Sequence, residues 1–179
     1  MMQFSIQKAI DNSVAPEPRK KPKSSWSPTD MGKCLRWVFY SRKGVAPIRE
    51  METRTYRIFK CGHFFEDFVI QQVTDDAKKN GYSIETQKRI TIPELDVTGY
   101  LDLRVNTPEG PIIYDVKSAN SRKFWAMNKF NKGADQHYME QVWLYLLAEQ
   151  VEDGRVFYVS KDDLTVAEFP VQLSDQRLR

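Results

Sequence analysis

The sequence feature that most constrains the fold is a pair of strand-like segments joined by a tight break. Residues 95–105 and 111–117 are rich in Leu, Ile, Val and Tyr, with polar residues interspersed. The sequence Asn-Thr-Pro-Glu-Gly-Pro at 106–111 separates them. Proline and glycine between two such segments are typical of a β-hairpin turn. We therefore expect an antiparallel hairpin over this part of the chain.

The register of this hairpin brings two carboxylates together. A turn centred on residues 108–109 places Asp102 directly opposite Asp115, with Cβ atoms about 4.5–5.5 Å apart. Side chains alternate along a strand, so Lys117 shares the face of Asp115 and Val116 points away. Like charges that face each other in a half-buried sheet are unfavourable. The sequence therefore predicts a cation between them.

A hard divalent cation with oxygen ligands, Mg²⁺ or Mn²⁺, suits two carboxylates best. The carbonyl oxygen of Val116 is a further expected ligand. Lys117 would orient or deprotonate a water, or neutralise charge that develops on a phosphate. The alternative is an exposed ionic strip on an antiparallel hairpin, with no catalytic role.

The segments around the hairpin predict helices before it and a helix with two strands after it. Residues 27–44 and about 50–80 have a helical apolar period, with Gly62 a possible break in the second helix. The later segments predict, in order, a strand at 82–92, a basic loop or short helix at 118–132, a helix at 135–149, and strands at 155–160 and 165–171. This order predicts a mixed sheet covered by helices, of class α/β or α+β.

Three motifs resemble those of the RecB-like exonuclease branch of the PD-(D/E)XK nuclease superfamily. They are Gly99-x-x-Asp102, Asp115-Val116-Lys117 and Gln141-x-x-x-Tyr145. The resemblance implies a restriction-endonuclease-like α/β fold, with a mixed β-sheet flanked by helices. It also implies Mg²⁺- or Mn²⁺-dependent hydrolysis of DNA phosphodiester bonds. Gln141 and Tyr145 lie one helical turn apart, and the resemblance places them beside the catalytic site, facing the nucleic acid.

The resemblance also implies an acidic residue or histidine on an upstream helix, usually as Gly-x-x-x-His. Here the segment reads Gly62-His63-Phe-Phe-Glu66, so Glu66 is the expected third carboxylate and metal ligand. His63 lies three residues earlier and is a possible additional site residue, because it could reach the same site. The alternative for His63 is an ordinary, partly buried histidine.

Residues 27–40 resemble the entry helix of RecB-like nucleases, including the CRISPR-associated exonucleases. Iron–sulfur members of that group use a cysteine here and three more near the C-terminus. This sequence has no cysteine after Cys61, so the resemblance implies no such cluster. We therefore expect Cys34 to be a buried helix residue.

The charges predict a polyanionic partner. Residues 1–25 carry five basic and two acidic side chains, a difference that equals the net charge of +3. Residues 26–60 carry eight basic and three acidic side chains, and residues 117–132 carry five basic and no acidic ones. Such stretches are typical of a DNA-binding surface, and the alternative is a solvated surface. The expected DNA contacts are Arg36, Lys123, Lys129 and Lys132, with Trp125 and Phe130 as stacking candidates.

We expect a basic, proline-rich flexible arm over residues 1–25 and a nuclease domain over 26–179. The expected function is an exonuclease in DNA recombination, repair or processing that acts on ends or single strands. A structure-specific endonuclease and an inactive DNA-binding relative are the alternatives. The sequence shows no membrane-spanning run, no signal peptide and only two cysteines, which favours a cytoplasmic protein. By resemblance, the compact domain would suit a phage or mobile element, with protein partners in a recombination or processing complex.

Overall fold

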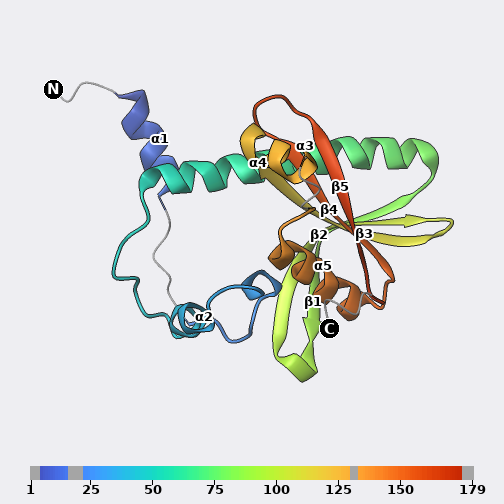
Figure 1. The fold of residues 1–179 in the computed structure, drawn as a ribbon, viewed down its shortest axis with the longest axis horizontal. Helices are drawn as coiled ribbons and strands as arrows, with labels where there is room; N and C mark the ends of the chain where they lie inside the picture. Colours follow the sequence, from blue (N-terminus) through green and yellow to red (C-terminus); the bar gives the residue numbers. More distant parts are fainter. Residues whose placement is uncertain (1–4, 16–21, 130–132, 175–179) are drawn as a thin grey trace.

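The computed structural model describes residues 5–15, 22–129 and 133–174 (Figure 1). The side chains of residues 128 and 129 also lie outside the description. The helices are α1 (Ile6–Val14), α2 (Leu35–Arg42), α3 (Thr53–Asn80), α4 (Ser121–Lys129) and α5 (Gln136–Glu149), with short 3₁₀ helices at Pro28–Asp30 and Pro93–Leu95. The strands are β1 (Ser83–Ile92), β2 (Val97–Thr107), β3 (Gly110–Ala119), β4 (Asp153–Ser160) and β5 (Val166–Gln172).

The five strands form one mixed sheet in the order β1-β2-β3-β4-β5. Neighbouring strands are antiparallel except for β3 and β4, which are parallel. A parallel pair needs a crossover connection, and here α4 and α5 supply it. The predicted fold class, an α/β mixed sheet flanked by helices, is confirmed.

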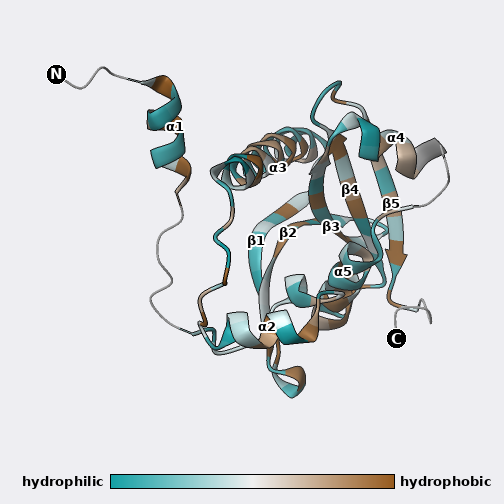
Figure 2. Ribbon diagram, turned by 60° about the vertical axis from the view of Figure 1, so that its left-hand side comes forward, coloured by the Kyte–Doolittle hydropathy of each residue, from teal (hydrophilic) through white to brown (hydrophobic). Residues whose placement is uncertain are grey.

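The helices α5 and α3 cover opposite faces of the sheet (Figure 2). On the α5 face, Val142, Tyr145 and Leu146 pack against Ile113 and Val156 in the main core. On the α3 face, the smaller core contains Val69, Val116 and Val159, packed with Phe65, Val73 and Phe157. Because Val116 faces α3, its neighbours Asp115 and Lys117 face the α5 side of the sheet.

The single helix expected over residues 27–44 is wrong. Ser27 caps a short 3₁₀ helix, and α2 begins only at Leu35. Gly32 interrupts the helix with a φ of +67°, and a Cβ there would lie 2.6 Å from the Cβ of His137 on α5. The interruption therefore allows this segment to approach α5 closely. Cys34 lies at the exposed start of α2 and is not a buried helix residue.

Gly99, the first residue of the Gly-x-x-Asp motif, has a packing role. A Cβ at this position would lie 2.6 Å from Cδ of Pro28. The glycine therefore lets the 3₁₀ helix at Pro28–Asp30 pack directly on β2. Elsewhere, α3 runs through Gly62 without a break.

Part of the expected flexible arm is helical. Ser5 caps α1, which lies beside the start of α3 and away from the sheet (Figure 1). Asp11 of α1 forms an ion pair with Arg57 of α3 at 3.5 Å. Residues 16–21 of the proline-rich stretch lie outside the described residues. None of the helices in the described parts of the chain is both long enough and apolar enough to cross a membrane.

Candidate active site

The hairpin forms in the expected register. Residues Leu103 to Thr107 of β2 pair with Tyr114 to Gly110 of β3, around the predicted turn at 108–109. The ladder ends at Leu103–Tyr114, one position short of the two aspartates. Asp102 therefore lies where β2 separates from β3, and its Oδ2 accepts a hydrogen bond of 2.8 Å from the backbone N–H of Val116.

Three oxygen atoms converge on the ammonium group of Lys117. Its Nζ lies 2.6 Å from Oδ2 of Asp115 and 4.0 Å from Oδ2 of Asp102. It also donates a hydrogen bond of 3.3 Å to the carbonyl oxygen of Val116. Asp115 is fully buried, whereas the Asp102 side chain is 14% exposed. The structure thus places a cation among the atoms that the sequence predicts as metal ligands.

Burial dominates the electrostatics of this group. It raises the pKa of Asp115 to about 7, although Lys117 opposes that shift; Asp102 and Glu66 add to it. Burial also raises the pKa of Asp102. Burial alone would lower the pKa of Lys117, but the two aspartates outweigh it and the pKa is raised. The ammonium therefore stays charged at neutral pH.

Gln141 on α5 orients Asp115. Its Nε2 donates to Oδ1 of Asp115 and to the hydroxyl of Tyr145, both at 2.8 Å. Gln141 is 4% exposed and Tyr145 is 1% exposed. The expectation that these residues face nucleic acid needs correction, because both side chains are enclosed by the protein. Their position lets them hold Asp115 in place.

Glu66 on α3 lies close enough to Asp102 for the two charges to interact. Its Oε1 accepts a hydrogen bond of 2.7 Å from Nε2 of Gln87, and its Oε2 lies 3.6 Å from Nδ1 of His63. Burial raises the pKa of Glu66, and the charge of Asp102 adds to this shift. His63 is 72% exposed, so it is not the partly buried histidine of the alternative. Gln87 was missed by the sequence analysis, since nothing in the strand pattern distinguishes it.

The donor set suits a hard divalent ion. Within the described ranges, no three His, Cys, Asp or Glu side chains are grouped closely enough to hold a metal. Oδ2 of Asp115 is buried, and among the described residues it has no hydrogen-bond partner of good geometry. Its neighbour is the Lys117 ammonium, which is surrounded by oxygens of the kind that Mg²⁺ and Mn²⁺ prefer.

The predicted DNA contacts that the structure describes lie on α2 and α4. Lys123 of α4 forms an ion pair with Asp135 and lies 5.8 Å from the centre of the Tyr138 ring. Arg36 is exposed on α2. Lys129 ends α4, but its side chain, together with Lys132 and Phe130, lies outside the described residues. Trp125 is 52% exposed on α4.

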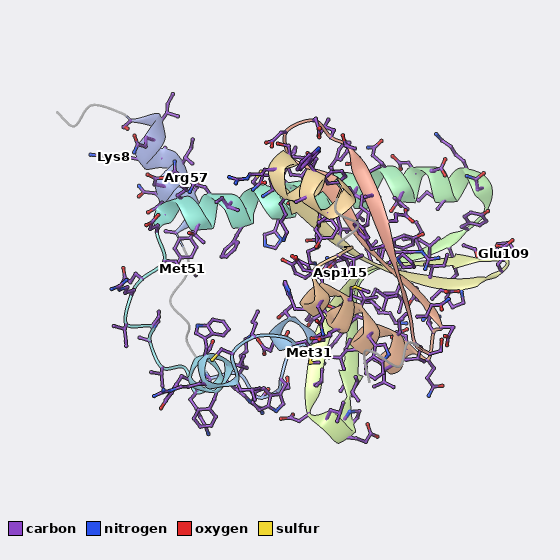
Figure 3. The ribbon with its side chains drawn as sticks, in the orientation of Figure 1. Lys8, Met31, Met51, Arg57, Glu109 and Asp115 are labelled. Carbon is purple, nitrogen blue, oxygen red and sulfur yellow. The ribbon has the colours of Figure 1, made fainter. Side chains whose placement is uncertain are left out.

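A second feature is a set of exposed aromatic residues, which we call the N-terminal face. It consists of residues on α2 and α3: Trp37, Phe39, Tyr40, Phe59, Phe64 and Phe68. Basic side chains accompany them, with Lys33 5.5 Å from the Trp37 ring centre and Lys43 5.8 Å from that of Phe39. Figure 3 shows Asp115 in the middle of the molecule, between α3 and α5.

Comparisons with known proteins identify the fold. No family model matches the sequence, and no curated protein matches it. A crystal structure of SSO0001 matches with a TM-score of 0.59 and 17% identity, over 96% of this chain and 79% of that one. The alkaline exonuclease LHK-Exo from Laribacter hongkongensis matches with a TM-score of 0.59 and 12% identity, over 83% and 77%. Its complex with dAMP matches at 0.59 and 13%, over 87% and 80%. At such low identities the likeness shows a shared fold.

Proposed function

We propose that this protein is a divalent-metal-dependent nuclease that hydrolyses phosphodiester bonds in DNA, as an exonuclease in recombination, repair or processing. The observation that carries the proposal is the convergence of Asp102, Asp115 and the Val116 carbonyl on one cation, the Lys117 ammonium. A buried group of like charges at the open end of a hairpin is expensive for a fold that has no use for it.

The proposed ligands of a Mg²⁺ or Mn²⁺ ion are Glu66, Asp102, Asp115 and the carbonyl oxygen of Val116. When bound, such an ion would make a water more acidic and would stabilise negative charge on the scissile phosphate. Gln141 would hold Oδ1 of Asp115, which leaves Oδ2 free to face the ion. Tyr145 would in turn fix the Gln141 amide.

Lys117 has a second role in this proposal. Its ammonium is the one cation that the described structure shows in contact with Asp115. With the carboxylates occupied by a metal, the same group would orient the attacking water or neutralise charge on the phosphate. Its Nζ lies 5.1 Å from the centre of the Tyr138 ring, so the aromatic face already offers it an alternative neighbour.

Two observations support DNA as the substrate. The N-terminal face combines exposed aromatic rings with basic side chains, a combination that suits stacked bases and phosphates. In addition, the structural neighbour LHK-Exo is an alkaline exonuclease, and one of its structures contains dAMP. We assign the proposed exonuclease to the RecB-like, CRISPR-exonuclease-related group without the iron–sulfur cysteines because of its sequence motifs, Gly99-x-x-Asp102, Asp115-Val116-Lys117 and Gln141-x-x-x-Tyr145. A phage or mobile-element source, a cytoplasmic location in the host cell and partners in a recombination complex belong to the same proposal.

The domain division is also proposed. Residues 26–179 would form the PD-(D/E)XK nuclease domain, and residues 1–25 would form a basic arm in which α1 packs on α3. His63, Arg36, Lys123, Lys129 and Lys132 remain proposed auxiliary contacts to DNA or metal.

The test is cleavage of end-labelled linear DNA and of covalently closed circular DNA, with Mg²⁺, Mn²⁺ or EDTA. We expect metal-dependent release of nucleotides from linear DNA only. Asp115→Asn should abolish it and leave DNA binding intact, whereas Asp75→Asn, an exposed carboxylate elsewhere on α3, should not. Nicking of closed circles would favour the endonuclease. DNA binding without cleavage at any metal concentration would favour the inactive relative, and full activity of Asp115→Asn would refute the site.

A further inference from the structure

The glutamine at position 87 adopts an unusual backbone conformation beside the site. Gln87 lies in the middle of β1 and has a φ of +49°, in the left-handed region that residues with a side chain rarely adopt. It occupies the position opposite Asp102, because the β1–β2 pairs on either side are Thr86↔Leu103 and Lys88↔Leu101. The pairing is interrupted at this one position, where both residues belong to the site.

The side chain of Gln87 makes a single described contact that explains this conformation. Its amide Nε2 donates a hydrogen bond of 2.7 Å to Oε1 of Glu66, across the gap between β1 and α3. The other carboxylate oxygen, Oε2, lies 3.6 Å from Nδ1 of His63. The amide therefore fixes the rotation of a carboxylate that approaches Asp102 from another element.

Strained backbone positions persist where the surrounding structure holds them, and they cluster at functional sites. Asn or Gly would occupy a left-handed position at a lower conformational cost than Gln. Asn is too short by one methylene to reach Glu66 from the same backbone, and Gly has no amide. The presence of glutamine at this strained position is thus explained by the side-chain length that the hydrogen bond to Glu66 requires.

We propose that Gln87 is a positioning residue, which orients Glu66 as a ligand for the divalent metal; this inference rests on the proposed function. Partners that orient metal ligands are typically worth 10- to 100-fold in metal affinity. Gln87 itself would contact neither metal nor DNA. Its removal should therefore weaken metal binding and raise the metal concentration needed for cleavage, while turnover at saturating metal stays near that of the wild type.

The experiment measures Mn²⁺ affinity by isothermal titration calorimetry on full-length protein without DNA, together with the melting temperature. Gln87→Gly removes the amide and releases the backbone strain, so the expected result is an unchanged or higher melting temperature with at least tenfold weaker Mn²⁺ binding. Gln87→Asn keeps an amide that cannot reach Glu66, so this variant should weaken Mn²⁺ binding similarly. Raising the Mn²⁺ concentration should restore cleavage by both variants.

Gln150 offers a matched control. It is an exposed glutamine with a φ of +53° that caps the end of α5. Gln150→Gly should leave Mn²⁺ affinity and cleavage unchanged. Wild-type affinity in Gln87→Gly, or in Gln87→Asn should the glycine variant not fold, would overturn the inference. If the wild type itself bound no Mn²⁺, the metal-dependent function would fail, which is a separate outcome.

Discussion

Replacing Lys117 with methionine, which has a similar shape and no charge, separates its two proposed roles. In the structure the ammonium lies 2.6 Å from Oδ2 of Asp115 and 4.0 Å from Oδ2 of Asp102. Asp115 is fully buried, and the Asp102 side chain is 14% exposed. A unit charge pair at 4 Å is worth about 4 kcal/mol at an effective dielectric constant of about 20. Removal of one partner of a buried pair costs about 3–5 kcal/mol in measured cases. The two figures agree on the size of the effect.

We therefore expect Lys117→Met to lower the free energy of unfolding of metal-free protein by about 3–5 kcal/mol at pH 8, where Asp115 is ionised in the wild type. Saturating Mn²⁺ should remove most of this difference, because the metal replaces the ammonium as counter-ion. Cleavage should nevertheless fall by about 10²- to 10⁴-fold at saturating Mn²⁺.

The assay is denaturation by urea with EDTA or with Mn²⁺, followed by tryptophan fluorescence, in parallel with DNA cleavage. Lys79→Met, at an exposed lysine in the last turn of α3, is the control and should change neither measurement appreciably. Equal stability of Lys117→Met and wild type in EDTA would refute the counter-ion role. Normal cleavage by a folded, Mn²⁺-saturated Lys117→Met would refute the catalytic role.

Four further predictions concern pH, the α5 residues and the N-terminal arm. Cleavage at fixed Mn²⁺ should rise between about pH 6 and 8 as Asp115 ionises, since its pKa is raised to about 7. Protonation of Asp115 should stabilise the folded protein without metal, because burial raises the pKa of this group. This contribution to the free energy of unfolding is fully present below about pH 4 and is lost as the pH rises through 7, which urea titrations at several pH values would show. Gln141→Ala and Tyr145→Phe should lower the cleavage rate more than the DNA affinity, with up to about 10²-fold loss of rate. A loss of DNA affinity alone would indicate that these residues contact DNA. Deletion of residues 1–25 should flatten the slope of log K for DNA binding against log salt concentration by about 0.7–0.9 per lost phosphate contact, with turnover at saturating DNA unchanged. A loss of turnover would show that the arm belongs to the fold or to the site.

The sequence could predict the parts of the fold that depend on local periodicity. Strand alternation and a two-residue turn determine that Asp115 and Lys117 share a face and that β2 and β3 pair in the observed register. The helical period likewise predicts that Gln141 and Tyr145 are stacked on one side of α5. These relationships hold within one element or one hairpin.

The remaining features depend on contacts between distant elements. The burial of Gln141 follows from the docking of α5 on β3, which its own helical pattern does not reveal. The break at Gly32 depends on the approach of His137, and the exposure of Cys34 follows from that break. The left-handed backbone of Gln87 has no signature in a strand pattern, because glutamine is unexceptional there.

The parallel pairing of β3 with β4 has a consequence for how the protein folds. The strands β1, β2 and β3 follow one another as hairpins, so their contacts are local and should form early. The pairing of β3 with β4 must wait until the chain from 120 to 152 has closed a long loop, which is entropically slower. Gln141 lies in that loop, so Asp115 stays hydrated and unpaired with Gln141 until the crossover closes. We expect pulsed hydrogen exchange to show protection of β1–β3 before α5, with the contact between Asp115 and Gln141 completed by the final folding step.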